Sequence, residues 1–276
     1  MHIFDSHAHY FDERYNDPTE GPGADEILKT ILSAYGGNVS HIVNIGTNID
    51  SSRTAVAQAA RYEGMYAAVG IHPEDCQQIE HPEAQIAALR TLLGCDTPDP
   101  AAYRKQTKIV AIGEIGLDYY YEDIPRDIQK NAFRMQMALA KELDMPVIIH
   151  EREAHDDGMR IVKEFPTVKG VFHCYSGSAE MARQLVNMGW YIGFTGVLTF
   201  KNARKAVETA ASIPLDRIVL ETDCPFMAPE PYRGKRNDPG YLPKMAEKLA
   251  EIRGISLEEV VKITTENAKR LYRFSE

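Results

Sequence analysis

Short apolar runs alternate with longer amphipathic stretches along this chain, and the alternation repeats about every 30 residues. Each run is rich in Val, Ile and aromatic residues, and a polar loop and a segment with apolar positions at helical spacing follow it. This order is typical of βα units, in which helices connect parallel strands. The eight predicted strands are Ile3–Tyr10, His41–Thr47, Tyr66–His72, Ile109–Asp118, Pro146–His150, Gly170–Ser176, Trp190–Gly196 and Arg217–Asp223.

The clearest predicted helix covers Arg126–Leu143, where apolar residues at helical spacing form a broad stripe. We interpret the methionines of this stripe as core residues. Another helix ends the chain, and Ser256 with Glu259 gives it the S-x-x-E pattern of a capping box. The segment Gly94–Thr107 contains two prolines, and we predict a loop extension there.

Eight strands that are each followed by a helix predict a closed (β/α)8 barrel, the TIM barrel of the α/β class. Such barrels need about 250 residues, and the chain has 276. Length alone would also allow two domains. Because the barrel accounts for the whole chain, we expect a single domain over residues 1–276.

The composition, with 44% apolar and 26% charged residues, is that of an ordinary globular protein and excludes disordered and collagen-like chains. No segment approaches the roughly 18 apolar residues of a membrane span, and the first residues lack the layout of a signal peptide. The four cysteines form no C-x-x-C pair, which favours free thiols in a reducing compartment. We therefore expect a cytoplasmic protein that does not use a membrane.

The formal net charge is −9, so no overall positive field draws the chain to a nucleic acid or to an anionic membrane. Any polyanion that the protein handles must therefore be held by a local site. In a (β/α)8 barrel, that site lies at the C-terminal ends of the strands.

Polar residues that are able to do chemistry gather at the predicted C-terminal strand ends. They are His7, His9, His72, Glu114, His150, His173 and Asp223. The opposite strand ends carry only His41 and Arg217. A single histidine in such a place is more often a structural residue, but seven coincident placements favour an active site.

His7 and His9 stand two residues apart on one strand, so both side chains leave the same face and can reach one ion. Imidazole and carboxylate donors suit Zn, Mn, Fe or Co, and the absence of a thiolate cluster argues against a structural zinc site. The four histidines and two carboxylates available exceed what one tetrahedral catalytic ion needs. We therefore predict two divalent ions, with Glu114 as the bridge between them.

Three residues beside these positions need separate interpretation. Asp5 shares the face of His7 one layer deeper, where it either orients an imidazole or is held by backbone donors. Cys174 and Cys224 directly follow two of the predicted ligands. Because side chains alternate along a strand, we interpret both thiols as packing residues.

Seven motifs are spread over nearly the whole chain. They are DSHAH from residue 5, VGIHP from 69, IGEIGLDY from 112, PVIIHER from 146, HCYSG from 173, ETDCP from 221 and RGKRN from 233. Together they resemble the TatD family of metal-dependent hydrolases, usually described as deoxyribonucleases, within the amidohydrolase-like barrel superfamily. The chain departs from the family pattern in an acidic loop at 12–17 and in the extension at 94–107, and both could alter the substrate range.

The resemblance implies a ligand set for two divalent ions, for which we expect Zn, Mg or Mn. It places one ion on His7, His9, Glu114 and Asp223 and the other on Glu114, His150 and His173. The catalytic residues are then Glu114, as the bridge, and Asp223, as the base that takes a proton from a metal-activated water.

The resemblance also implies cleavage of phosphodiester bonds in DNA, with RNA as a related substrate. Because the chain lacks a long basic groove, we expect exonucleolytic attack at chain ends or on single strands. Arg152, Arg233 and Arg236 lie near the predicted metals and His72 could donate to a phosphate oxygen, so these four are predicted substrate-binding residues. No obligate protein partner is implied.

Two other functions stay open. A related amidohydrolase would use the same ions to cleave an amide or an ester, including the ester of an aminoacyl-tRNA. Many binuclear members of that superfamily bridge their metals with a carboxylated lysine on the fourth strand, where this chain has Glu114 and no lysine. The other alternative is a barrel that has lost catalysis and acts as a scaffold, but the complete ligand set argues against it.

Overall fold

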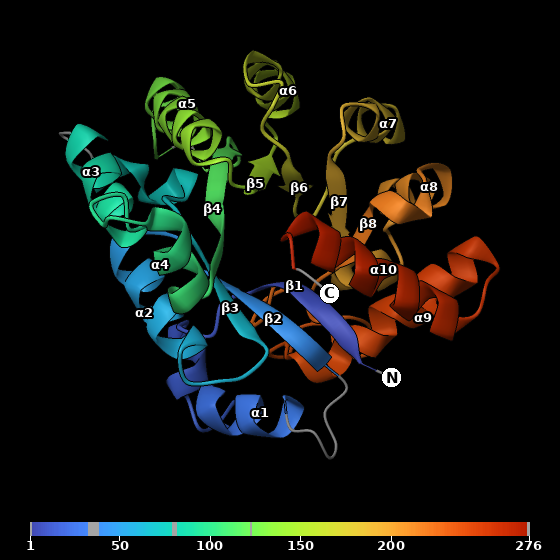
Figure 1. The fold of residues 1–276 in the computed structure, drawn as a ribbon. Coiled ribbons are helices and arrows are strands. Elements are labelled where there is room, and N and C mark those ends of the chain that lie inside the picture. Colours follow the sequence, from blue (N-terminus) through green and yellow to red (C-terminus); the bar gives the residue numbers. More distant parts are fainter. Residues whose placement is uncertain (1, 33–38, 79–81, 122, 275–276) are drawn as a thin grey trace. The chain divides into compact units, whose positions relative to one another are not determined.

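Eight strands form one sheet in chain order (Figure 1). The computed structural model describes residues 2–32, 39–78, 82–121 and 123–274. The strands are β1 (Ile3–Ala8), β2 (Val39–Ile45), β3 (Met65–Val69), β4 (Ile109–Asp118), β5 (Val147–Arg152), β6 (Gly170–Phe172), β7 (Tyr191–Phe194) and β8 (Ile218–Leu220). Each pair with a described register is parallel, and a parallel bridge joins Ala8 to Cys224, which follows β8. This order confirms the predicted (β/α)8 fold.

Helices separate the strands along the chain. The α-helices are α1 (Ala24–Ile31), α2 (Ile49–Ala59), α3 (Pro82–Leu92), α4 (Pro100–Thr107), α5 (Arg126–Leu143), α6 (His155–Glu164), α7 (Ala179–Asn187), α8 (Arg204–Ser212), α9 (Leu242–Arg253) and α10 (Leu257–Leu271). The 3-10 helices are η1 (Glu13–Asn16), η2 (Pro73–Gln78), η3 (Gly196–Thr199), η4 (Leu215–Arg217) and η5 (Pro239–Tyr241). The predicted bounds of α5 are confirmed, and Ser256 Oγ caps α10 by accepting a 3.1 Å hydrogen bond from the Glu259 N–H.

The prediction of a loop extension over Gly94–Thr107 is wrong in its second half, which forms α4. Asp99 precedes the helix and its Oδ1 accepts a hydrogen bond from the Ala102 N–H at 2.9 Å. Pro100 then occupies the first turn, where proline has the right φ and no backbone donor is needed. The proline that suggested a loop therefore begins a helix.

The predicted strands run further toward their C-termini than most of the observed ones. β4 has the predicted bounds, whereas β1 ends at Ala8 and β8 ends at Leu220. After β6 and β8 the backbone leaves the extended conformation of a strand. Cys174, which follows β6, has a φ of 41°, and Asp223, which follows β8, has a φ of 57°. Several candidate site residues thus lie on the first residues after a strand.

The chain divides into two compact units, and each draws on separate stretches of sequence. Unit 1 contains Met1–Asn44, Tyr62–Met65 and Cys174–Glu276, and unit 2 contains Ile45–Arg61 and Tyr66–His173. The single domain expected over residues 1–276 stays a prediction.

In unit 1, α10 is fixed to the strands by buried side chains. Asn267 Nδ2 donates to the Ile218 carbonyl at 2.7 Å, and Tyr272 donates its hydroxyl to the Ser6 carbonyl at 2.7 Å. The ring of Phe4 stacks on Tyr272 with 5.9 Å between centroids. These contacts attach both β1 and β8 to α10 and to Tyr272, which directly follows it. The ends of both strands carry candidate site residues.

In unit 2, two buried glutamines of α5 are bonded to the ends of strands. Gln136 accepts from the Ile71 N–H at 2.8 Å and donates to the Ile71 carbonyl at 3.0 Å, just before His72. Gln129 does the same at Asp118, with both distances 2.8 Å. Each amide satisfies backbone groups that leave the strand ladder, so α5 positions the ends of β3 and β4.

Among the described residues, no helix combines the length and the apolar composition needed to cross a bilayer. All four cysteines are free thiols, as predicted. The cytoplasmic location stays a prediction.

Candidate metal centre

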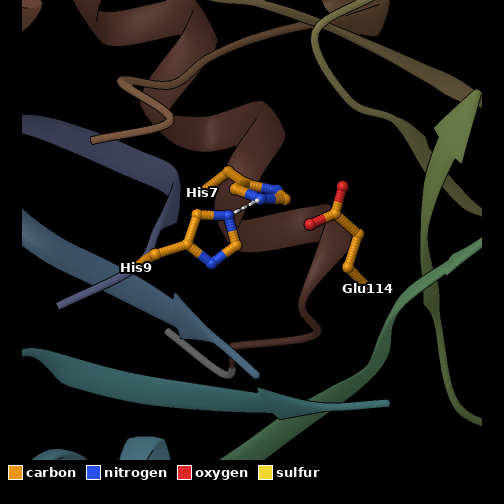
Figure 2. A group of neighbouring side chains, drawn as sticks. All are labelled: His7, His9 and Glu114. Atoms are coloured by element: carbon orange, nitrogen blue, oxygen red, sulfur yellow. Dashed lines mark hydrogen bonds between the residues drawn. The ribbon is translucent and has the colours of Figure 1, made fainter. Parts of the chain in front are cut away.

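The end of β1 presents two imidazoles to each other. His7 Nε2 lies 3.0 Å from His9 Nε2, and Figure 2 shows these ring nitrogens pointing together. Asp223 Oδ1 lies 3.7 Å from His7 Nε2 and 3.4 Å from His9 Nε2. The three side chains are buried. Unit 1 thus brings three of the predicted ligands together, with nitrogen and oxygen donors facing one another.

Asp223 is held beside β1 by backbone hydrogen bonds. Its N–H donates to the His7 carbonyl at 2.9 Å, and the His9 N–H donates to the Cys224 carbonyl at 2.8 Å. Its φ of 57° lies in the left-handed region, which residues other than glycine seldom adopt. Such strained residues cluster at functional sites, where the surrounding structure must hold them in place.

The carboxylate of Asp5 holds backbone rather than an imidazole. Its Oδ1 accepts from the Thr222 N–H at 2.9 Å and from the His7 N–H at 3.3 Å, and its Oδ2 accepts from the Thr222 hydroxyl at 2.6 Å. This confirms the second of the two interpretations of Asp5. Complete burial raises the pKa of Asp5 to about 7, against the lowering effect of these hydrogen bonds.

In unit 2, one carboxylate faces several imidazoles. Glu114 Oε1 lies 2.8 Å from His173 Nε2 and 2.9 Å from His150 Nδ1. His72 Nε2 lies 3.8 Å from the same oxygen. Glu114, the third side chain drawn in Figure 2, comes from the middle of β4 and is 3% exposed. Glu114 thus lies with the two histidines that are predicted to hold the second ion.

Sequence reasoning missed Asp118 as a site residue. His150 Nε2 lies 2.9 Å from Asp118 Oδ2, so both ring nitrogens of His150 face carboxylates. Burial alone lowers the pKa of His150, but the hydrogen bonds from Asp118 and Glu114 outweigh it and raise the pKa to about 9. The signal was available, because Asp118 follows Glu114 by four residues on one strand and so shares its face.

Glu221 is a second buried carboxylate that sequence reasoning did not select. It is fully buried, its Oε1 accepts from the Cys174 N–H at 2.6 Å, and its Oε2 accepts from the Ser6 hydroxyl at 3.2 Å. A Cβ on Gly193 would lie 2.6 Å from the Glu221 carboxylate, so glycine leaves room for it. Glu221 therefore ties the backbone after β6 to β1.

The predicted substrate-binding residues have different surroundings. The Arg152 guanidinium lies over the rings of Tyr120 and Tyr121, at 3.6 and 5.3 Å from their centroids. Arg233 is exposed and lies 4.2 Å from the centroid of Phe200.

Arg236 is buried and holds backbone. It donates to the Arg14 carbonyl at 3.1 Å and to the Pro22 carbonyl at 2.6 Å. His72 was predicted to contact the substrate, but it could also be a metal ligand. Its donor atom and those of Glu114 and His150 all lie within 4.8 Å of one another.

Of the two thiols beside the predicted ligands, Cys224 has the packing role that was predicted for it, whereas Cys174 is half-buried. Cys224 is fully buried, and burial raises its pKa to about 12. The Cys174 sulfur lies 3.3 Å from the Thr195 hydroxyl. A thiol with so high a pKa is a poor thiolate donor, and the donors that converge in each unit are imidazole nitrogens and carboxylate oxygens. This donor set fits divalent ions such as Zn or Mn.

A barrel of parallel strands whose ends carry buried imidazoles and carboxylates is typical of metal-dependent hydrolases. Comparison with known proteins identifies the family. The family model described as TatD related DNase matches residues 4–273. The chain therefore belongs to the TatD family of metal-dependent hydrolases.

Two relatives align along nearly their whole length. The uncharacterized metal-dependent hydrolase YabD of Bacillus subtilis is 42% identical over 99% of this chain and 100% of its own. The uncharacterized metal-dependent hydrolase TatD of Mycobacterium tuberculosis is 30% identical over 98% of this chain and 97% of its own. The crystal structure of YJJV, a TatD homologue from Escherichia coli K12, superimposes with a TM-score of 0.84 at 29% identity and covers 99% of this chain and 98% of that one.

Proposed function

We propose that this protein hydrolyses phosphodiester bonds of DNA by means of two divalent metal ions. The proposed ligands are His7, His9, Glu114 and Asp223 for one ion and Glu114, His150 and His173 for the other. The observation that carries the proposal is the convergence of donors in each unit, where Asp223 faces His7 and His9 and where Glu114 faces His150 and His173. In the family fold, the ends of all eight strands meet at one end of the barrel, which supports one centre built from both ligand groups.

The residues of the chain have separate tasks in this reaction. Two divalent ions supply an activated water and stabilise negative charge on the phosphate. Asp223 has two carboxylate oxygens, of which Oδ1 faces His7 and His9. The side chain is 10% exposed, so its second oxygen can accept the proton that water loses.

Asp118 acts through His150. Its carboxylate fixes the ring orientation by the 2.9 Å contact to Nε2.

The proposed substrate follows from the family and from the charges near the centre. The family model is that of DNases, and the relatives named above are metal-dependent hydrolases. With a net charge of −9, the protein depends on local cations, of which Arg152 and Arg233 are the proposed phosphate contacts. We propose that it attacks ends or single strands, because few phosphates can be engaged at once.

The experiment compares substrate classes on one preparation. Metal-reconstituted protein is incubated with end-labelled single-stranded and duplex DNA, with single-stranded and duplex RNA, and with an aminoacyl ester. The Glu114→Gln variant serves as the control for contaminating nucleases. We expect nucleotides to be released from single-stranded DNA by the wild type and not by the variant. Faster cleavage of the ester than of any nucleic acid would assign the centre to acyl transfer, and no turnover with full metal occupancy would assign it to a scaffold.

A further inference from the structure

A cavity of about 330 Å³ lies in unit 1, next to the segment that follows Asp223. Its walls include the apolar side chains of Phe200, Phe226 and Met227. Arg14, Arg233 and Lys235 also line it. The volume is at the lower end of the range for small-molecule pockets, about 300–1,000 Å³, which suits one compact group.

The apolar wall is unusually exposed. Phe226 is 40% exposed and Met227 is 41% exposed, and the two are adjacent in sequence. Single exposed apolar residues are ordinary, but neighbouring ones that line a concave surface are typical of binding sites.

Two cations of this cavity carry no ion pair in the part of the chain that the structure describes. The described contact of the Arg233 side chain is the ring of Phe200, at 4.2 Å from its centroid. The exposed Lys235 ammonium likewise has no described carboxylate partner. Arg14 differs, because it is paired with Glu20 at 3.0 Å. In an acidic chain, two unpaired cations in an aromatic-lined cavity, one of them on a ring, favour an anionic ligand with a flat apolar part.

The cavity adjoins the proposed ligands of the same unit. The centroid of the Phe226 ring lies 6.3 Å from that of His9, and the Phe226 N–H donates to the Asp223 carbonyl at 2.8 Å. A part of the substrate that rests on Phe226 would therefore be only a few bonds away from the part that reacts beside His9 and Asp223.

The backbone segment that carries Phe226 and Met227 is fixed by close packing and by a hydrogen bond. A Cβ on Gly196 would lie 2.0 Å from the Met227 carbonyl, so the segment after Asp223 can pack on η3 only because this residue is glycine. Thr199 Oγ1 also accepts from the Glu230 N–H at 2.8 Å. The backbone that carries these exposed side chains is thus held in position before a ligand arrives, which lowers the entropic cost of binding.

We propose that this cavity binds the unpaired base of the terminal nucleotide of a single strand. The base stacks on Phe226, and Arg233 and Lys235 contact the neighbouring phosphate. Every base has a flat face, so such a site accepts any sequence but requires an unpaired base. This inference rests on the proposed function, which it refines by naming the part of the substrate that is recognised.

Binding to metal-free protein tests the cavity apart from catalysis. In chelator, the affinity of a labelled short DNA single strand is measured for the wild type, Phe226→Leu and Phe226→Trp, with and without an abasic 5′ or 3′ end. Stacking of one base is worth a factor of about five or more, so Phe226→Leu should weaken binding by at least that factor. Phe226→Trp should retain the affinity of the wild type, and abasic ends should make the wild type resemble Phe226→Leu.

The matched control is Ile128→Ala, which removes a similarly exposed apolar side chain, 37% exposed, from α5 in unit 2. It should leave the affinity unchanged, and unfolding midpoints check that all variants are folded. Equal affinity of the wild type and Phe226→Leu, or no effect of an abasic end, would overturn the inference even if the enzyme cleaves DNA. Base-dependent binding by a protein that cleaves only the aminoacyl ester would support the cavity and refute the proposed function.

Discussion

The carboxyl group of Asp5 illustrates how a buried residue can support the site without touching an ion. It holds both the backbone and the hydroxyl of Thr222, the residue before Asp223. The residue is fully buried, and burial raises its pKa to about 7 from 3.8. The folded metal-free protein therefore keeps the proton of Asp5 at pH values where the unfolded chain has lost it.

Asp5 makes the stability of the metal-free protein depend on pH. Because the folded pKa is raised, its contribution is complete below about pH 4 and is lost as pH rises to about 7. The loss is a few kcal/mol at most. An amide side chain cannot ionise, so the Asp5→Asn variant should lose less stability over this window. Urea unfolding in chelator at pH 5, 6 and 8 measures the difference, and parallel profiles for the two proteins would contradict the assignment.

Glu114 and Asp118 differ in how many ligands each one holds. Glu114 contacts His150 and His173, whereas Asp118 contacts His150. Because Glu114 is also the proposed bridge, Glu114→Gln should reduce the binding of both ions and abolish turnover. Asp118→Asn should retain one tightly bound ion and lower metal affinity or activity about 10–100-fold. Elemental analysis and chelator competition give the stoichiometry, and a Glu114→Gln protein that keeps two ions would show that another group is the bridge.

The two proposed roles of Asp223 can be separated by a substitution. Asparagine keeps one weak oxygen donor but cannot accept a proton. General-base assistance contributes about 10²–10⁴-fold, so Asp223→Asn should lose at least about a hundredfold in single-turnover rate at saturating metal. If the variant reaches the wild-type rate once both ions are bound, Asp223 is a ligand only.

At the scale of elements, periodicity and strand ends predicted most of what the structure contains. The bounds of α5 and β4 follow from apolar spacing. The candidate ligands were chosen because a parallel barrel gathers its strand ends. Pro100 was misjudged because a proline by itself fits a loop as well as the first turn of a helix. The residue that distinguishes the two is Asp99, which caps the helix directly before Pro100.

Interactions between distant residues escaped prediction for a physical reason. The bonds of Arg236 to the Arg14 and Pro22 carbonyls join positions that no local pattern relates. A sequence shows which residues can do chemistry, but their partners depend on tertiary packing.

The loop after β8 contains two arginines with opposite expected effects. Arg236 is buried and bonded to two carbonyls, so Arg236→Ala should cost about 1–3 kcal/mol of stability. Arg233 is exposed on the ring of Phe200, so Arg233→Ala should keep the stability and raise KM for oligonucleotides. Thermal unfolding and steady-state kinetics on the two variants check this. A loss of stability in Arg233→Ala as large as in Arg236→Ala would give both a structural role.

At the scale of the whole molecule, a net charge of −9 must coexist with a polyanionic substrate. The overall field opposes the approach of a long nucleic acid, so affinity has to come from the ions and from a few local cations. Arg152 and Arg233 lie on aromatic rings and Lys235 lines the apolar cavity, and these are the cations that we propose as phosphate contacts. This arrangement favours short contacts with a strand end over tracking along a duplex.

The salt dependence of KM measures how many phosphates are engaged. Each phosphate contact on a single strand changes the logarithm of the affinity by about 0.7 per unit of log salt concentration. Three phosphate contacts should therefore give a plot of log KM against log salt concentration a slope of about 2. Lengthening the single strand beyond the few nucleotides that these cations reach should leave KM nearly constant, because the net charge of −9 opposes further phosphate contacts. KM values for strands of increasing length at several salt concentrations provide the test. A steeper slope that keeps growing with strand length would reveal an extended binding surface and contradict recognition of strand ends.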